Sequence, residues 1–237
     1  MRYFCLICDY DGTIAHDGRC APSTVEALKR VRASGRKLIL ATGRQLTELQ
    51  EVFPEHAVFD RIVAENGAVL YRPANQECTV LADSPSAEFV DELRRRRVQP
   101  LSVGQCIVAT WRPFASTVLE VIRDMGLDLQ VISNKDAVMV LPSGVNKASG
   151  LQVALNELCL SPQNAVGVGD AENDLVFLGM CECSVAVDNA LPALKEHADY
   201  VTAGSHGDGV EELIEELLSE DLASLAPRLT RDRNLHV

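Results

Sequence analysis

The sequence predicts an α/β fold, in which a doubly wound, Rossmann-like parallel sheet forms the core and a small α+β cap is inserted into it. Three observations support this prediction. Apolar runs alternate with helical patterns near both ends of the chain. The runs are continuously apolar, as in parallel strands that are covered on both faces. Between them, residues 83–141 have a different rhythm of short helices and strands.

The first β-α-β unit begins with an apolar run at residues 3–8, which is expected to be a strand. Ser23 followed by Glu26 has the spacing of a capping box, and apolar residues then recur on one helical face. Gly35 is expected to end this helix. The next apolar run, residues 37–41, is expected to be the second strand.

The same alternation returns in the last third of the chain. Leucines on one helical face precede Pro162, and residues 165–169 form the next apolar run. Shorter patterns then predict a helix at 174–178, a strand at 184–187, a helix from Pro192, a strand at 200–202 and a helix at 210–218. The predicted core is therefore discontinuous, made of residues 1–82 and 142–218, and residues 219–237 are predicted to form a tail.

The cap is predicted to span residues 83–141. Its patterns indicate helices at 87–98 and 115–125 and strands at 105–110, 129–132 and 137–141. The basic run at residues 94–97 is interpreted as the solvated face of the first cap helix. Specificity for the substrate is assigned to this cap.

The composition is that of a soluble globular protein with an acidic excess. Lysine and arginine number 22 against 34 aspartates and glutamates, a net charge of −12. Proteins that bind nucleic acids or anionic membranes need a basic face, so the charge argues against both classes. The chain has neither a secretory signal nor a run of about 18 apolar residues. It is therefore predicted to be cytoplasmic, as a monomer or a homodimer.

Two carboxylates, Asp9 and Asp11, follow the first predicted strand. They lie at the carboxyl end of that strand, where open α/β sheets bind ligands. Residues two apart on an extended chain project to the same side, so both are expected to face one reacting group, with Gly12 permitting a tight turn. A single aspartate here would be an ordinary turn former, but two in tandem repel each other unless a cation or a function compensates.

Two weaker signals come from Thr42-Gly43-Arg44 and from Lys147. A hydroxyl and free backbone amides after the second strand suit phosphate oxygens, although Thr42 as a plain helix cap is the alternative. Lys147 begins the helix that follows the cap, where a cation is unfavourable to the helix dipole. This position favours a functional role for Lys147 over a role in helix stability, and a plain surface lysine is the alternative.

A second acidic group, Asp170, Asn173 and Asp174, follows the run at 165–169. Acidic residues there also suit a helix amino terminus. Together with Asp9, the two aspartates form the oxygen-rich set that Mg²⁺ prefers, since this ion is held by a few carboxylates, waters and substrate phosphate. The predicted cofactor is therefore Mg²⁺.

In this order, the four motifs resemble those of the haloacid dehalogenase superfamily phosphatases. The cap between the second and third motifs is similar to the C2-type α+β cap of the Cof-type, sucrose-phosphate-phosphatase-like branch. The resemblance implies that Asp9 is the nucleophile, Asp11 the general acid and base, Thr42 the phosphate-binding hydroxyl, and Lys147 the cation that holds nucleophile and phosphate.

The resemblance also implies a metal site and further substrate contacts. Asp170 and Asp174 correspond to the magnesium carboxylates, Asn173 to the polar residue between them, and the backbone carbonyl of Asp11 to another metal ligand. Gly43, Arg44 and Asn66 correspond to residues near the substrate phosphate. For Arg44 and Asn66, a role in stabilising turns is the alternative.

The implied activity is the Mg²⁺-dependent hydrolysis of a small phosphorylated metabolite, a sugar phosphate or a phosphoglycolate-like compound, through an aspartyl-phosphate on Asp9. One alternative is a phosphomutase or phosphotransferase, in which the group passes to a sugar instead of water. The fold alone does not separate these two activities. A catalytically silent binding module is a further alternative, and the complete set of acidic residues with Lys147 argues against it.

Overall fold

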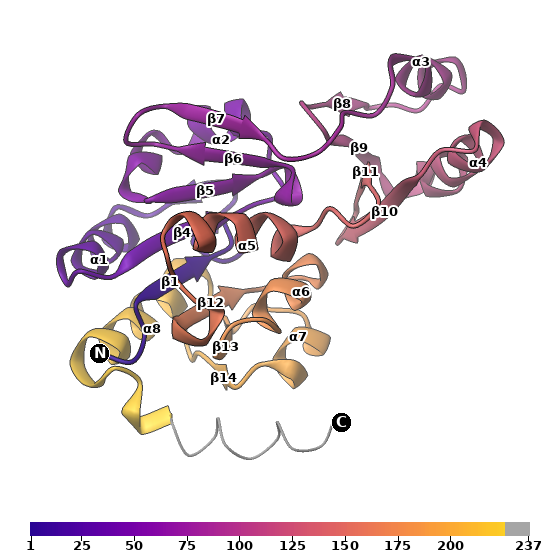
Figure 1. Cartoon of the computed structure of the whole chain (residues 1–237). Helices are drawn as coiled ribbons and strands as arrows, with labels where there is room; N and C mark the ends of the chain where they lie inside the picture. Colours follow the sequence, from indigo (N-terminus) through magenta and orange to yellow (C-terminus); the bar gives the residue numbers. More distant parts are fainter. Residues whose placement is uncertain (226–237) are drawn as a thin grey trace.

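The computed structural model describes residues 1–225, and Figure 1 shows their arrangement. An eight-stranded sheet forms the core, in the order β14-β13-β12-β1-β4-β5-β6-β7. The first six of these run parallel: β14 (Tyr200–Val201), β13 (Cys183–Ala186), β12 (Ala165–Gly169), β1 (Cys5–Cys8), β4 (Lys37–Ala41) and β5 (Arg61–Ala64). The predicted α/β fold class is confirmed.

Helices cover both faces of this sheet (Figure 1). Helix α1 (Pro22–Ala33) contacts α8 (His206–Glu220), and α5 (Lys147–Glu157) contacts both α6 (Leu175–Leu178) and β5. Two further helices are short, α2 (Leu46–Val52) and α7 (Pro192–His197). Every residue of β1 and β12 is buried, as expected for central parallel strands.

The cap has a sheet of its own, in the order β10-β11-β9-β8. Its strands are β8 (Ser102–Val103), β9 (Val108–Trp111), β10 (Leu129–Asn134) and β11 (Ala137–Pro142). Helices α3 (Ala87–Arg95) and α4 (Ala115–Met125) pack on this sheet through a separate apolar cluster that includes Phe89, Leu93 and Val118. Figure 1 shows the cap projecting from one end of the core.

Of the basic run at 94–97, Arg94 and Arg95 lie on the solvated side of α3, and the other two residues follow it, because α3 ends at Arg95 and not at the predicted residue 98. Phe89, Val90 and Leu93 form the buried side of the helix. Arg94, Arg95 and Arg96 form ion pairs with acidic residues of the cap itself, Asp91, Glu92 and Asp124.

The capping box predicted from Ser23 and Glu26 is wrong. Helix α1 begins earlier, at Pro22, and its N-cap residue, Ala21, makes no side-chain cap bond. Proline suits the first helical position because its φ is already helical and it has no N–H to satisfy. The helix therefore starts without the predicted pair.

The core sheet is mixed, because two antiparallel strands extend it beyond β5. These are β6 (Val69–Arg72) and β7 (Glu77–Val80). A small hairpin, β2 (Ala15–His16) and β3 (Arg19–Cys20), follows the first motif. The sequence analysis predicted none of these strands, nor β5.

The last helix also differs from the prediction. Helix α8 begins at His206, before the predicted residue 210, and ends at Glu220. The predicted tail therefore starts inside α8, and its residues 226–237 lie outside the described part of the chain. Within residues 1–225, no helix combines the length and apolar character needed to cross a membrane.

Candidate active site

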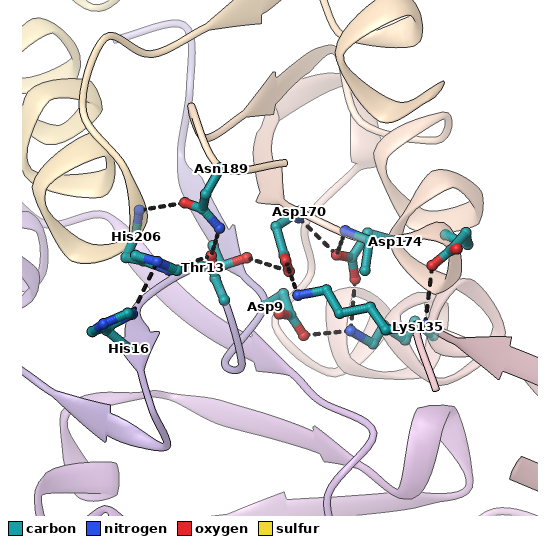
Figure 2. Close-up of polar contacts among 12 residues, drawn as sticks. Asp9, Thr13, His16, Lys135, Asp170, Asp174, Asn189 and His206 are labelled. Carbon is teal, nitrogen blue, oxygen red and sulfur yellow. Dashed lines mark hydrogen bonds and ion pairs between the residues drawn. The ribbon is translucent and has the colours of Figure 1, made fainter. Parts of the chain in front are cut away.

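The predicted site residues lie where the parallel strands of the core end. Asp9 directly follows β1, Asp170 follows β12, and Thr42 follows β4. These three strands are neighbours in the sheet, so their carboxyl ends lie at one edge. Figure 2 shows Asp9, Asp170 and Asp174 directed toward one another at this edge.

Asp9, Asp170 and Asp174 form an acidic cluster. Each offers one carboxylate oxygen, and these oxygens lie within 4.8 Å of one another. The exposed fractions of the three residues are only 4%, 0% and 0%. Three buried carboxylates at this distance repel strongly unless cations are present.

Lys147 supplies one of these cations. Its Nζ donates to Oδ1 of Asp9 and, at 2.6 Å, to Oδ1 of Asp174. The residue is 1% exposed and opens α5, where the side chain of Asn146 caps the helix by accepting from the backbone N–H of Ser149. Burial alone would lower the pKa of Lys147, but Asp174 and Asp9 outweigh it and raise that pKa, so Lys147 is an ammonium ion.

The carboxylates retain an excess of negative charge. Burial raises the pKa of Asp9 well above its ordinary value, Asp174 raises it further, and Lys147 opposes both effects. Burial also raises the pKa of Asp170, against the opposing hydrogen bond from Lys135. Three carboxylates thus face two ammonium groups, an oxygen-rich arrangement that a divalent cation would complete.

Backbone geometry holds the cluster in place. Gly12 has a φ of +86°, and a Cβ atom there would lie 2.3 Å from Oδ2 of Asp170, so only glycine fits the predicted turn. Oδ2 of Asp174 accepts from the backbone N–H groups of Asp170 and Ala171, at 2.9 and 3.0 Å. The Thr13 hydroxyl donates to Oδ1 of Asp170 at 3.3 Å.

A second layer supports the turn at Gly12. Asn189 Nδ2 and His206 Nδ1 both donate to the Gly12 carbonyl oxygen, at 2.7 and 3.0 Å. His206 also contacts His16 of the β2–β3 hairpin, with Nε2 of His206 3.0 Å from Nδ1 of His16 (Figure 2). The loop that carries Asp11 and Gly12 is therefore fastened to the start of α8.

Asp11 has a different partner from Asp9. Arg44 Nε and Nη2 donate to its two carboxylate oxygens, at 2.6 and 2.7 Å, in a bidentate pair. The Asp11 carboxylate is therefore directed to Arg44 and is not a member of the acidic cluster. The Arg44 guanidinium also lies over the Tyr10 ring, 5.4 Å from its centre.

The residues expected around the substrate phosphate lie beside one another. Thr42 is not a helix cap, because α2 begins at Leu46 and the Thr42 hydroxyl accepts from the backbone N–H of Arg44 at 3.1 Å. Asn66 donates its backbone N–H to the Thr42 carbonyl oxygen, and Asn173 Nδ2 donates to Asn66 Oδ1 at 3.1 Å. Cap residue Met139 lies against Gly43.

Asn66 and Asn173 each retain one open polar atom. Among the described residues, Asn66 Nδ2 and Asn173 Oδ1 are buried without a hydrogen-bond partner. Asn66 also has a left-handed backbone, with a φ of 54°. A buried donor and a buried acceptor side by side suit the oxygens and hydroxyls of a bound ligand, since leaving them unpaired is costly.

Sequence reasoning missed three residues of the site. Lys135, on the cap, places its Nζ 2.7 Å from Oδ2 of Asp170. Thr13 belongs to the first motif, but no role was predicted for its hydroxyl. Glu65 is buried, and its carboxylate accepts backbone N–H bonds from the cap. No local pattern marks Lys135 or Glu65, because their partners lie far away in the sequence.

Residues 6–99 and 124–214 match the haloacid dehalogenase-like hydrolase family. The phosphoglycolate phosphatase of Methanothermobacter thermautotrophicus is 34% identical over 214 residues, which cover 87% of this chain and 95% of that protein. The phosphoglycolate phosphatase of Haloarcula marismortui is 33% identical over 226 residues, covering 88% of this chain and 95% of that protein. Both relatives are therefore similar over nearly their whole length.

Solved structures share the fold. A haloacid dehalogenase-like hydrolase from Bacteroides thetaiotaomicron has a TM-score of 0.73 at 21% identity, covering 91% of this chain and 99% of that one. A sugar phosphatase of haloacid dehalogenase subclass IIB has a TM-score of 0.73 at 20% identity, covering 90% and 98%. The resemblance identified from the motifs is confirmed: the chain belongs to the haloacid dehalogenase-like hydrolases and is one of their phosphatases.

Proposed function

We propose that this phosphatase is magnesium-dependent and hydrolyses a small phosphorylated metabolite through an aspartyl-phosphate on Asp9. One observation carries the proposal: the buried carboxylates of Asp9, Asp170 and Asp174 lie together at the carboxyl edge of the sheet, where Lys147 donates to Asp9 and Asp174. The names of the relatives support phosphoglycolate as a substrate, and that of a structural neighbour supports sugar phosphates.

The residues present suit a magnesium ion. Asp9, Asp170 and the backbone carbonyl of Asp11 would hold it, and all three are hard oxygen donors. Asp174 would contribute mainly by orienting the others, because its oxygens already accept from Lys147 and from two backbone N–H groups. When bound, Mg²⁺ supplies positive charge that offsets the negative charge of the phosphate.

In the first step, a carboxylate oxygen of Asp9 attacks phosphorus while the bond from phosphorus to the leaving oxygen breaks. Lys147 holds the attacking carboxylate in position and offsets its charge. Asp11 donates a proton to the leaving oxygen, so the substrate alcohol departs neutral. The phosphoryl group remains on Asp9 as an acyl phosphate, and one difficult step is divided into two easier ones.

In the second step, Asp11 takes a proton from a water molecule, which attacks the aspartyl-phosphate and releases inorganic phosphate. Acid–base help of this kind is worth about 100-fold to 10,000-fold in rate. Arg44 holds both oxygens of Asp11 in this structure, so Asp11 has to exchange this partner for the leaving oxygen.

The phosphate itself would be held by groups around Thr42. The Thr42 hydroxyl, the amides of Gly43 and Arg44, and the open Asn66 Nδ2 are the proposed contacts. Asn173 fixes the Asn66 side chain through its hydrogen bond to Oδ1. Positioning and charge stabilisation of this kind supply most of the catalysis in phosphoryl transfer.

Phosphate release from a panel of phosphoglycolate, sugar phosphates and nucleotides tests the proposal, with Mg²⁺ or with a chelator. We expect Mg²⁺-dependent release by the wild type and no multiple turnover by Asp9→Asn. Asp91→Asn, an exposed carboxylate on α3, is the matched control and should retain full activity. Multiple turnover by Asp9→Asn would contradict the nucleophile assignment. A need for a bisphosphate activator, with phosphate retained in the product, would indicate a mutase.

A further inference from the structure

Lys135 lies at the tip of the cap hairpin formed by β10 and β11. Asn134 pairs with Ala137, so Lys135 and Asp136 form a two-residue turn. The Lys135 side chain reaches from this turn to the acidic cluster, with Nζ 2.7 Å from Oδ2 of Asp170 (Figure 2). Strand β10 also contacts residues 172–174, so the hairpin tip lies against the fourth motif.

The turn itself does not explain a lysine at this position. Lys135 has a φ of 54°, in the left-handed region. Glycine, asparagine and aspartate adopt that region readily, and they are the residues that two-residue hairpin turns favour. A lysine is therefore not a residue that this turn favours, and its side-chain contact with Asp170 is the feature that distinguishes it.

Lys135 is also unlike the other cap cations. Arg94, Arg95 and Arg96 pair with acids of the cap, and Arg123 with Asp124. Among the ion pairs of residues 1–225, that of Lys135 with Asp170 is the one that joins a cap cation to a carboxylate of the site. The Lys135 side chain is 49% exposed, so it is free to change partner.

We propose that Lys135 recognises a carboxylate on the leaving group, so that the substrates are phosphorylated hydroxy acids. The inference rests on the proposed function. A divalent cation held by Asp170 would compete with Lys135 for that carboxylate and would repel its ammonium group. Lys147 and that cation would offset the charge of the phosphate. Lys135 is on the cap hairpin, so the anion left for it would be one carried by the leaving group.

This assignment selects between the two substrate classes left open above. A neutral sugar presents hydroxyl groups, which gain little from an ammonium ion beyond an ordinary hydrogen bond. A carboxylate gains a charge-assisted bond, which is roughly twice as strong. The lysine stem is long and flexible, so Lys135 can follow carboxylates at slightly different distances from the phosphate.

Lys135→Met tests the inference with two substrates of similar size, 2-phosphoglycolate and 2-hydroxyethyl phosphate, at saturating Mg²⁺. Loss of one charge-assisted bond should raise KM for phosphoglycolate about tenfold to a hundredfold, with kcat nearly unchanged. The kcat/KM for 2-hydroxyethyl phosphate should change by less than about twofold, because that substrate makes no such bond. Lys135→Arg should restore much of the loss, and Lys29→Met, an exposed lysine on α1, should match the wild type.

Each other outcome overturns the inference. An equal loss for both substrates would mean that Lys135 acts on the phosphate or on the acidic cluster. An unchanged KM for phosphoglycolate would mean that it contacts no carboxylate. Hydrolysis of neutral sugar phosphates alone would overturn the inference and leave the proposed phosphatase mechanism intact. Absence of hydrolysis across the whole panel would overturn both.

Discussion

Asp9 lies in a site whose carboxylates outnumber its ammonium groups. Burial and Asp174 together raise its pKa, although Lys147 donates a hydrogen bond to it. A nucleophilic carboxylate must be ionised, and burial together with Asp174 works against the ionised form of Asp9. The charge that would keep Asp9 ionised is the one that a bound divalent cation brings.

This imbalance predicts how the stability of the metal-free protein depends on pH. The folded pKa of Asp9 lies above its unfolded value, so the folded state binds more protons once the pH exceeds about 4. Stability therefore falls as pH rises from about 4 toward the folded pKa, and Asp9→Asn should flatten this fall. Tm measured from pH 4 to pH 8 in chelator checks this prediction. Added Mg²⁺ should raise the Tm of the wild type more at pH 8 than at pH 4. Parallel curves of Tm against pH for the wild type and Asp9→Asn would refute the prediction.

The role proposed for Asp11 differs from that of Asp9, and its carboxylate faces Arg44 and not the acidic cluster. We expect Asp11→Asn to lower turnover by about 100-fold to 10,000-fold through the loss of proton transfer. Steady-state phosphate release measures this effect. Asp17→Asn, a nearby exposed carboxylate on the β2–β3 hairpin, should leave the rate unchanged. A similar loss in both variants would show that the loop, and not proton transfer, was affected.

At the scale of elements, Glu65 connects the cap to the core. Its buried carboxylate accepts the backbone N–H groups of Gln105, Cys106 and Ile107, at 2.9, 2.7 and 3.0 Å. The strand predicted from residue 105 begins only at Val108, because these three N–H groups bond to Glu65 and not to a neighbouring strand. The next residue along the chain is Asn66, so the residue that binds the cap backbone is adjacent to a proposed substrate contact.

Glu65→Gln is therefore expected to destabilise the protein. An amide has one carbonyl oxygen, so at least one of the three N–H groups loses its acceptor and faces an NH2 group instead, which costs about 1–3 kcal/mol. The free energy of unfolding in urea measures the change. Glu196→Gln, at an exposed position on α7, is the control and should have little effect. An unchanged free energy of unfolding for Glu65→Gln would show that these bonds make no net contribution to the stability of the folded protein.

The elements that the sequence predicted well are those whose signals are local. The run at 37–41 coincides with β4, and Lys147 is the first residue of α5 as expected. Both signals depend only on residues that are close together in the sequence. The antiparallel strands β6 and β7 depend on pairing partners instead. The lysine of the cap hairpin was missed for the same reason, since its partner Asp170 is 35 residues away.

At the scale of the whole molecule, core and cap have separate apolar interiors joined by a small third cluster. That junction contains Ala68 and Met139, among other buried residues. Polar bonds from Glu65 and Lys135 complete the contact between the two parts. The candidate active site thus lies where the sheet edge of the core meets a cap with its own fold, and this placement supports the proposal that the cap contributes to the choice of substrate.

The sequence was enough to predict that the four motifs lie together, because the topology of a parallel sheet brings them to one edge. The excess charge of the site was foreseen in the two acidic motifs. What the sequence did not show was which groups pair. That Asp11 would lie with Arg44, and Asp174 with backbone amides, depends on side-chain packing across elements distant in sequence.

In the proposed mechanism, the phosphoryl group passes through the side chain of Asp9. Mixing Asp11→Asn with substrate and Mg²⁺, quenching in acid and locating the phosphoryl group by peptide mass spectrometry tests this step. We expect one phosphoryl group per chain, on the side chain of Asp9, and none when Asp9 is also changed to Asn. Phosphate release with no phosphorylated Asp9 at any time, or a phosphoryl group on another residue, would contradict it.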